Sequence, residues 1–258
     1  MMINKIKSEK ELNADCSDLI FWFQKIEKGD LNKEILHFFW GRLIWNAIKW
    51  KYDDVDESVV QSYVRDENLE QLNISDKSAK DIHSQLRTLQ MIENKWIHES
   101  FDREMVFDIY SQLSGISKKK IHLRNNIFTT STGFTTPVLP ESIDRELQSF
   151  FDLLESSHIE TMNGDLTLRI EKAVTVFAKL IWIHPFPDKN GRVARMSTNC
   201  LLRKWHLPYI PIPKVRNSPD WMESLKHAMD GRTERACSLF RKWIYSILAE
   251  TKKLFIKI

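Results

Sequence analysis

Apolar residues recur at helical intervals over most of this chain. The clearest case has apolar positions at i, i+4, i+7, i+8 and i+11: Ile143, Leu147, Phe150, Phe151 and Leu154. This spacing predicts a helix over 143–154, and similar patterns predict helices over 166–182 and 232–250. Only seven glycines occur in 258 residues, which disfavours a fold built on strands and tight turns. The fold class we expect is all-α.

The beginning and end of another expected helix can be read from single residues. Asp102 is a suitable N-cap for a helix over 103–113, and Gly115 is a suitable stop. Two stretches depart from the helical pattern. Residues 66–80 are polar and predict a loop, while residues 121–137 are rich in threonine and β-branched residues and predict an extended segment or a small hairpin.

The first hundred residues are helical in pattern and rich in tryptophan. The tryptophans of this part are Trp22, Trp40, Trp45, Trp50 and Trp96. We expect them to pack an N-terminal helical lobe against the rest of the chain. The division expected is therefore a lobe over 1–98 and a core over 99–258. If the chain forms a homodimer, the exposed part of this lobe is the first place to expect the contact.

Charge and cysteine usage exclude several classes of protein. The 38 basic and 35 acidic residues nearly balance, and we interpret the run Lys118–Lys120 as a solvated loop and not as a DNA-binding patch. The three cysteines, Cys16, Cys200 and Cys237, lie far apart and predict free thiols. The polar start of the chain is not a secretory signal, and no stretch is apolar enough to span a membrane. We expect a cytoplasmic protein without membrane or DNA partners.

The chemistry is concentrated in residues 184–195, which read His-Pro-Phe-Pro-Asp-Lys-Asn-Gly-Arg-Val-Ala-Arg. The two prolines end the preceding helix, so His184 lies at a helix end that faces a loop. The helical pattern resumes at Gly191, so the loop leads into a helix N-terminus, which favours anions. Arg192 and Arg195 are three residues apart and share one face of that first turn. A base, a carboxylate, backbone donors and two guanidiniums within twelve residues suit phosphate chemistry.

This stretch resembles the signature of the Fic family, H-P-F-x-(D/E)-G-N-G-R-x-x-R, at every defining position except one. Lys189 stands where the family has the first glycine of the loop. The resemblance covers residues 100–250 and implies a Fic-type helical core with a small β-hairpin flap over 121–137. It also implies helices over 166–182 and 191–205, a segment Pro211-Ile212-Pro213, and closing helices over 218–230 and 232–250.

The resemblance implies an enzyme that transfers AMP from ATP to a serine, threonine or tyrosine hydroxyl of another protein. His184 would be the general base, and Phe186 would anchor the loop in the core. Asp188 would hold Mg²⁺ against the phosphates. The target protein would bind along flap residues 125–136 by strand pairing.

The remaining residues of the motif would bind the nucleotide. Asn190 and the backbone of Gly191 would hold the α-phosphate, and Arg192 and Arg195 would bind the β- and γ-phosphates. Lys189 either points to solvent or adds a cation beside the triphosphate. Because glycine tolerates a positive φ and lysine does not, this substitution leaves the identity of the transferred group open.

Regulation is the second departure from the family. One class carries an inhibitory glutamate that pairs with the second arginine of the motif, and Lys49 stands at the comparable place here. We expect this built-in inhibition to be absent, because a lysine cannot pair with Arg195. Glu93 lies in a superficially similar context but lacks the serine or threonine four residues earlier. Two alternatives to AMP transfer stay open: transfer of another phosphate-containing group, and a catalytically silent binding module.

Overall fold

The computed structural model describes residues 9–26, 32–49, 51–68, 74–127, 138–156, 165–214 and 218–255. All regular structure in these ranges is helical, which confirms the all-α fold class. The elements are α1 (Glu9–Ile26), α2 (Asn32–Ile48), α3 (Glu57–Asp66), α4 (Asp76–Met91), the π-helical turn η1 (Ile92–Trp96), α5 (Arg103–Ser114), the 3₁₀ turns η2 (Lys118–Lys120) and η3 (Pro140–Ser142), α6 (Ile143–Ser156), α8 (Leu166–Ile183), α9 (Asn190–Lys204), α10 (Pro219–Met229) and α11 (Glu234–Phe255).

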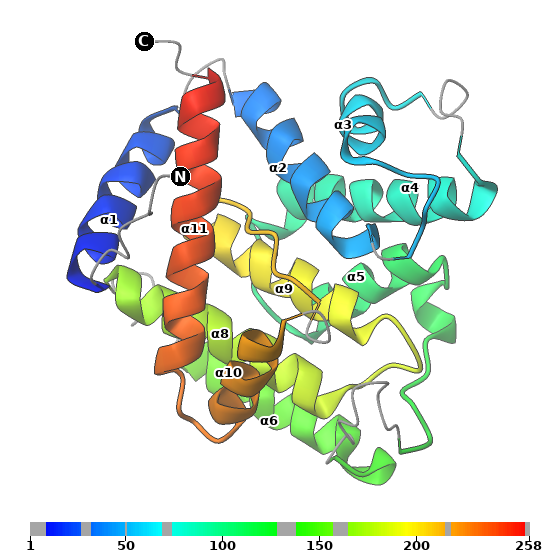
Figure 1. Cartoon of the computed structure of the whole chain (residues 1–258). Coiled ribbons are helices and arrows are strands. Elements are labelled where there is room, and N and C mark those ends of the chain that lie inside the picture. The colour runs from blue at the N-terminus through cyan, green and yellow to red at the C-terminus, as the bar shows by residue number, and fades with distance from the viewer. Residues whose placement is uncertain are drawn as a thin grey trace.

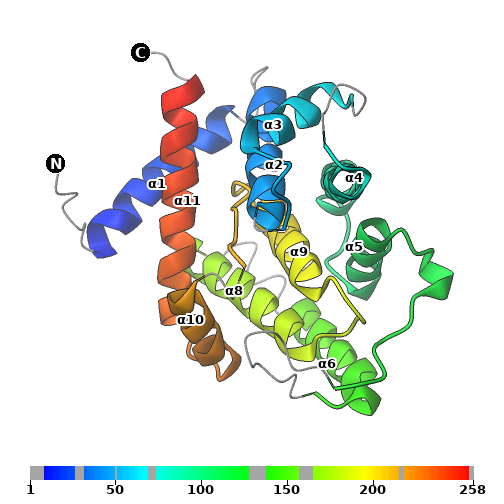
Figure 2. The ribbon, with the colours of Figure 1, turned by 45° about the vertical axis from the view of Figure 1, so that its right-hand side comes forward.

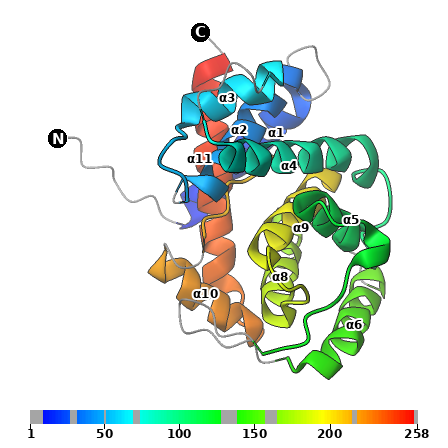
Figure 3. The same ribbon diagram turned by 90° about the vertical axis from the view of Figure 1, so that its right-hand side faces the viewer.

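The centre of the fold is the pair α8 and α9, which the loop over 184–189 connects (Figure 1). Helix α9 packs against α5 on one side, and α8 packs against α10 and α11 on the other (Figure 2). Helix α1 lies along α11, so the two ends of the described chain pack together. Helix α4 packs against both α2 and α5, and Figure 3 shows it passing across the α5 side of the bundle. This places the N-terminal helices beside the loop between α8 and α9.

Several expected helix ends are confirmed by the structure. The Asp102 carboxylate accepts a hydrogen bond from the Met105 amide at 2.9 Å and caps α5. Gly115 ends the same helix with φ of 72°, a left-handed conformation that glycine adopts without strain. Helices α6, α8, α9, α10 and α11 begin and end within a few residues of the expected positions, except that α11 continues to Phe255.

The expected loop over 66–80 is wrong at its C-terminal end, because α4 begins at Asp76, and residues 69–73 lie outside the described ranges. The Ser75 hydroxyl accepts a hydrogen bond from the Ser78 amide at 3.3 Å and caps the helix. The apolar stripe of α4 starts only at Ile82, so its first turn looks like a loop in the sequence. A first turn that is capped in this way needs no apolar residue, so apolar periodicity does not mark the start of the helix.

The expected hairpin over 121–137 is found only as unpaired extended chain in its described part, residues 121–127. Residues 128–137 lie outside the described ranges. Instead of a neighbouring strand, the Arg124 amide binds the Pro185 carbonyl at 2.9 Å. The first part of this segment is therefore held by the loop that follows α8.

One hydrophobic core runs through the described chain from Cys16 to Leu248. Trp40 and Trp96 are buried in it, and Trp22 and Trp45 pack against it, while Trp50 lies outside the described residues. The predicted boundary near residue 98 falls between η1 and α5, and the core is continuous across it, so the division into two domains stays a prediction.

The three cysteines are buried free thiols, as expected. None of the helices among the described residues combines the length and apolar character that crossing a bilayer requires.

Candidate functional site

The loop between α8 and α9 begins with a sharp change of direction at His184. This residue ends α8 in the left-handed region, with φ of 49° and ψ of 59°, and its amide binds the Leu180 carbonyl at 3.1 Å. The side chain of Asn190 then closes the loop from within. Its Oδ1 accepts from the Phe186 amide at 2.9 Å and its Nδ2 donates to the Phe186 carbonyl at 2.7 Å. Both polar atoms of the Asn190 side chain therefore hold the backbone of the loop. A contact between this side chain and a phosphate stays a prediction.

Phe186 lies in the core, where its side chain is 0% exposed. Its ring stacks on Tyr110 with centroids 4.0 Å apart and meets Phe107 edge-on at 5.4 Å. The Tyr110 hydroxyl donates a hydrogen bond of 3.2 Å to the exposed carboxylate of Asp188. Burial, and then the charge of Asp188, raises the pKa of Tyr110 to about 12, so the phenol stays protonated and keeps this donor. Tyr110 of α5 thus positions both Phe186 and Asp188 of the loop.

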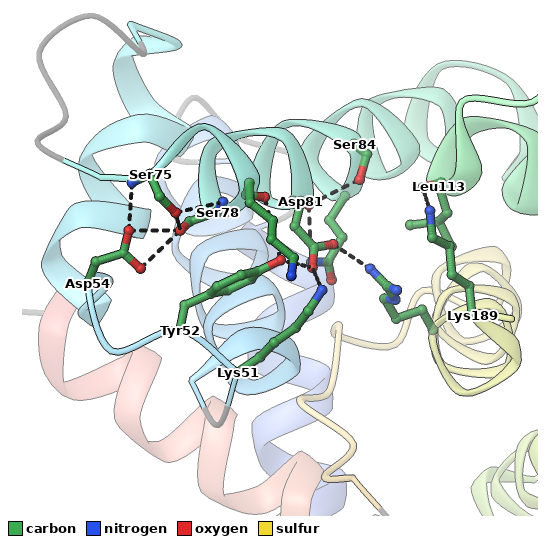
Figure 4. Close-up of polar contacts among 12 residues, drawn as sticks. Lys51, Tyr52, Asp54, Ser75, Ser78, Asp81, Ser84, Leu113 and Lys189 are labelled. Atoms are coloured by element: carbon green, nitrogen blue, oxygen red, sulfur yellow. Dashed lines mark hydrogen bonds and ion pairs between the residues drawn. The ribbon is translucent and has the colours of Figure 1, made fainter.

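Lys189 occupies the place of the family's first loop glycine, and its φ of 60° is in the region that favours glycine. Its carbonyl accepts from the amides of Arg192 and Val193 at 2.8 and 2.9 Å, which starts α9. Its ammonium group donates to the Leu113 carbonyl at 2.8 Å, near the end of α5. The expectation that a lysine here strains the backbone is correct, and the side chain points toward α5 (Figure 4).

The start of α9 has the features of an anion site. The first amide groups of a helix lack partners within the helix and carry a partial positive charge. Beneath them lies Arg195, which is 6% exposed and forms no ion pair with any carboxylate of the described residues. Burial, and then the charge of Arg192, lowers the pKa of Arg195 to about 10. An anion bound here would supply the charge that this guanidinium lacks.

Gly191 lies directly over that guanidinium. A Cβ at this position would lie 3.7 Å from the Arg195 Nη1 atom, an ordinary van der Waals distance. Packing within the chain therefore does not require a glycine here. A glycine here leaves the backbone at the start of α9 without a side chain beside the Arg195 guanidinium.

Arg192 is held by the N-terminal helices. It forms an ion pair with the Asp81 carboxylate of α4. The second oxygen of Asp81 accepts from Lys51 at 2.7 Å and from the Tyr52 hydroxyl at 3.0 Å (Figure 4). Burial acts to raise the pKa of Asp81, but Arg192 and Lys51 outweigh it, so the pKa is lowered and the group is ionised at neutral pH. An acid from the N-terminal part of the chain therefore reaches the first arginine of the motif.

His184 is partly buried and is neutral at physiological pH. Burial lowers its pKa to about 4, while a hydrogen bond to the Ile181 backbone opposes the shift and the charge of Arg124 adds to it. A neutral imidazole can accept a proton. Arg124 itself is 2% exposed and fixes the backbone around His184. It donates to the carbonyls of His184, Asn126, Val138 and Ile183 at 2.7, 2.7, 2.5 and 3.2 Å.

Sequence reasoning missed four of these residues: Tyr110, Arg124, Asp81 and Lys51. The only available signal was an arginine within an otherwise uncharged, strand-like segment, which marks Arg124. Glu93, which was not expected to be an inhibitory acid, pairs with Arg203 of α9 at 2.8 Å and not with Arg195. The structure brings Lys189 and Arg192 into one cavity, which His184, Asp188 and Arg195 do not line.

The donors present fit a magnesium ion that binds together with a nucleotide. No group of three or more His, Cys, Asp or Glu side chains that could hold a metal occurs among the described residues. Asp188 is a single exposed carboxylate beside the predicted phosphate site. Mg²⁺ is commonly held by one or two carboxylates together with substrate phosphates, so this donor set suits it.

Comparison with known proteins supports the resemblance. Residues 100–202 match the Fic/DOC family. The protein adenylyltransferase Fic of Nematostella vectensis is 34% identical over 95 residues, which are 37% of this chain and 21% of that protein. A uridine 5'-monophosphate transferase of Xanthomonas campestris is 36% identical over 76 residues, 30% of this chain and 14% of that protein. The chain thus spans about a fifth of the first relative's length and a smaller share of the second relative's.

The fold is shared with a Fic-domain-containing signaling protein of Bacteroides thetaiotaomicron. The two structures superpose with a TM-score of 0.73 over 95% of each chain, at 16% sequence identity. That likeness supports the arrangement of the helices, and the sequence match supports the family. The similarity to the Fic/DOC family thus lies in residues 100–202 of this chain.

Proposed function

We propose that this protein transfers AMP from ATP to a hydroxyl side chain of a target protein. One observation carries the proposal: the buried Arg195 lies without a carboxylate partner under Gly191, where α9 begins. A phosphate seated there would meet backbone amides and a desolvated guanidinium together. The relatives named protein adenylyltransferases support AMP as the transferred group.

The chemistry that follows is an in-line displacement. The target's hydroxyl oxygen forms a bond to the α-phosphorus, the bond from that phosphorus to the β-phosphate oxygen breaks, and pyrophosphate leaves. His184 takes the hydroxyl proton, which its neutral state allows. Arg195 stabilises the departing negative charge. Asp188, oriented by Tyr110, would hold Mg²⁺, which when bound neutralises phosphate charge.

The target would bind along residues 125–136. Arg124 supports this step because it fastens the start of that segment to the carbonyls of His184 and Ile183. A peptide paired with the segment would thus be placed relative to the imidazole. Cytoplasmic localisation, the absence of DNA and membrane partners, and a homodimer stay predictions.

A second candidate is transfer of another nucleotide. It is favoured by the relative named uridine 5'-monophosphate transferase and by Lys189 in place of a loop glycine. Incubating the wild type and His184→Ala with nucleotides labelled at the α- or γ-phosphate separates the candidates. Protein label from α-labelled ATP, lost in His184→Ala, supports AMP transfer, and label from α-labelled UTP alone supports the second candidate. Label from the γ-position supports kinase chemistry, and no label supports a silent binding module.

Regulation by a glutamate that pairs with Arg195 is proposed to be absent. Lys49 follows the last turn of α2, and no carboxylate of the described residues pairs with Arg195. Replacing Lys49 with Glu should restore such a pair and reduce self-modification with ATP. Unchanged self-modification in Lys49→Glu, with Lys49→Gln as the control for loss of the lysine, would show that this position has no inhibitory role.

A further inference from the structure

A cavity of about 450 Å³ lies between α4, the end of α5 and the start of α9. This volume is in the range of small-molecule sites. Only Lys189 and Arg192 of the Fic motif line it. The remaining wall comes from the N-terminal helices and from residues 112–115, so we call it the α4–α5 basin.

The walls of the α4–α5 basin carry five cationic side chains: Lys51, Lys77, Lys80, Lys189 and Arg192. Asp81 is the single carboxylate among the lining residues. It is already shared between Arg192 and Lys51, as Figure 4 shows for its contact with Lys51. The charge of the walls therefore favours a ligand with several negative charges.

The three other cations form no ion pair or hydrogen bond with a carboxylate of the described residues. Lys77 and Lys80 are exposed and share with Asp81 and Ser84 one face of α4, at positions i, i+3, i+4 and i+7. Lys189 donates to a neutral carbonyl, that of Leu113. Burial, and then the charge of Arg192, lowers the pKa of Lys189, while the charges of Asp188 and Asp81 act in the opposite direction.

We propose that the α4–α5 basin binds a small, multiply charged anion of the phosphate class. Phosphate groups combine several charges with many acceptor oxygens, which matches lysines that carry three donors each. The cavity is too small for a folded partner and large enough for a chain of a few phosphates. The basin shares Lys189 and Arg192 with the proposed nucleotide site, but His184, Asp188 and Arg195 do not line it. The proposal goes beyond AMP transfer because it rests on Lys77 and Lys80, which lie outside the motif.

The test is a calorimetric titration of tripolyphosphate into the full chain at low salt. We expect measurable binding to the wild type. Each lysine should contribute roughly fivefold to the affinity, because a solvent-screened charge pair at close range changes a binding constant by about that factor. Lys77→Ala/Lys80→Ala should therefore bind roughly thirtyfold more weakly. The matched control is Lys252→Ala/Lys253→Ala, which removes the same charge from exposed positions of α11. This control should bind as the wild type does.

Equal affinity in the basin variant and the wild type, or no binding to the wild type, would overturn the proposal. Should the double variant fail to fold, Lys77→Gln and Lys80→Gln carry the same comparison singly. His184→Ala should bind tripolyphosphate normally, so a failure of AMP transfer and a failure of the basin are distinguishable.

Saturating ATP separates the basin from the α9 anion site, which would also bind a triphosphate. Tripolyphosphate binding that persists under saturating ATP, and that Lys77→Ala/Lys80→Ala removes, supports a separate anion in the basin. Loss of all tripolyphosphate binding under saturating ATP would place the anion at the nucleotide's own phosphates and would overturn the proposal.

Discussion

The backbone at Lys189 can be tested by comparing two substitutions at this one position. Lys189→Gly and Lys189→Ala both remove the hydrogen bond to the Leu113 carbonyl, so its loss cancels between them. They differ in how each residue tolerates a φ of 60°. An L-residue pays about 1–2 kcal/mol in this conformation, whereas glycine does not. Glycine in turn loses about 0.5–1 kcal/mol through the greater entropy of its unfolded chain.

The balance makes Lys189→Gly more stable than Lys189→Ala by about 0.5–1 kcal/mol. Urea unfolding measures this difference directly, and a melting temperature higher by about 1–4 °C accompanies it. Lys242, an exposed residue in the interior of α11, is the matched control. There the order reverses, and glycine is less stable than alanine by about 1 kcal/mol. If alanine equals or exceeds glycine at position 189 while the control behaves as expected, the left-handed conformation of the loop is wrong.

Three other substitutions test separate parts of the site. Arg124→Ala should lower the free energy of unfolding by at least about 3 kcal/mol, because it strands several buried carbonyls; a loss below 1 kcal/mol in urea unfolding would show that these bonds do not hold the segment. His184 binds a proton more weakly in the folded chain than in the unfolded chain, because its pKa is lowered from 6.5 to about 4. The free energy of unfolding should therefore fall by roughly 3 kcal/mol from this group as the pH drops from 6.5 to 4. In His184→Gln this part of the pH dependence should vanish, and its persistence would contradict the lowered pKa. Tyr110→Phe keeps the ring stack but frees Asp188, so the Mg²⁺ concentration for half-maximal labelling should rise while stability changes by less than about 1 kcal/mol; an unchanged Mg²⁺ requirement would remove the positioning role of the hydroxyl.

Much of the fold follows from local signals in the sequence. The start and end of α5 are fixed by Asp102 and Gly115, whose side chain and backbone freedom act within one helical turn. The motif likewise predicts the loop over 184–189 and the start of α9, because its prolines and turn residues also act locally. Helix α4 was missed at its start because its first turn is polar and its cap, Ser75, is an ordinary serine in a polar stretch.

The surroundings of the motif could not be predicted in this way. Asp81 and Arg192 are separated by 111 positions in the sequence, and no residue near either one indicates that they form a pair. The same holds for the contact of Tyr110 with Asp188, since a tyrosine on an amphipathic helix looks like any other core residue. Such contacts depend on how helices pack, and packing is decided by the whole chain.

A crystal structure with a non-hydrolysable ATP analogue and Mg²⁺ would show whether the start of α9 binds phosphate. We expect a phosphate within hydrogen-bond distance, about 3 Å, of the first amides of α9 and of the Arg195 guanidinium. We also expect the metal on Asp188 and the His184 ring facing the α-phosphate. A triphosphate bound away from the start of α9, with Arg195 still lacking an anionic partner, would refute the anion site.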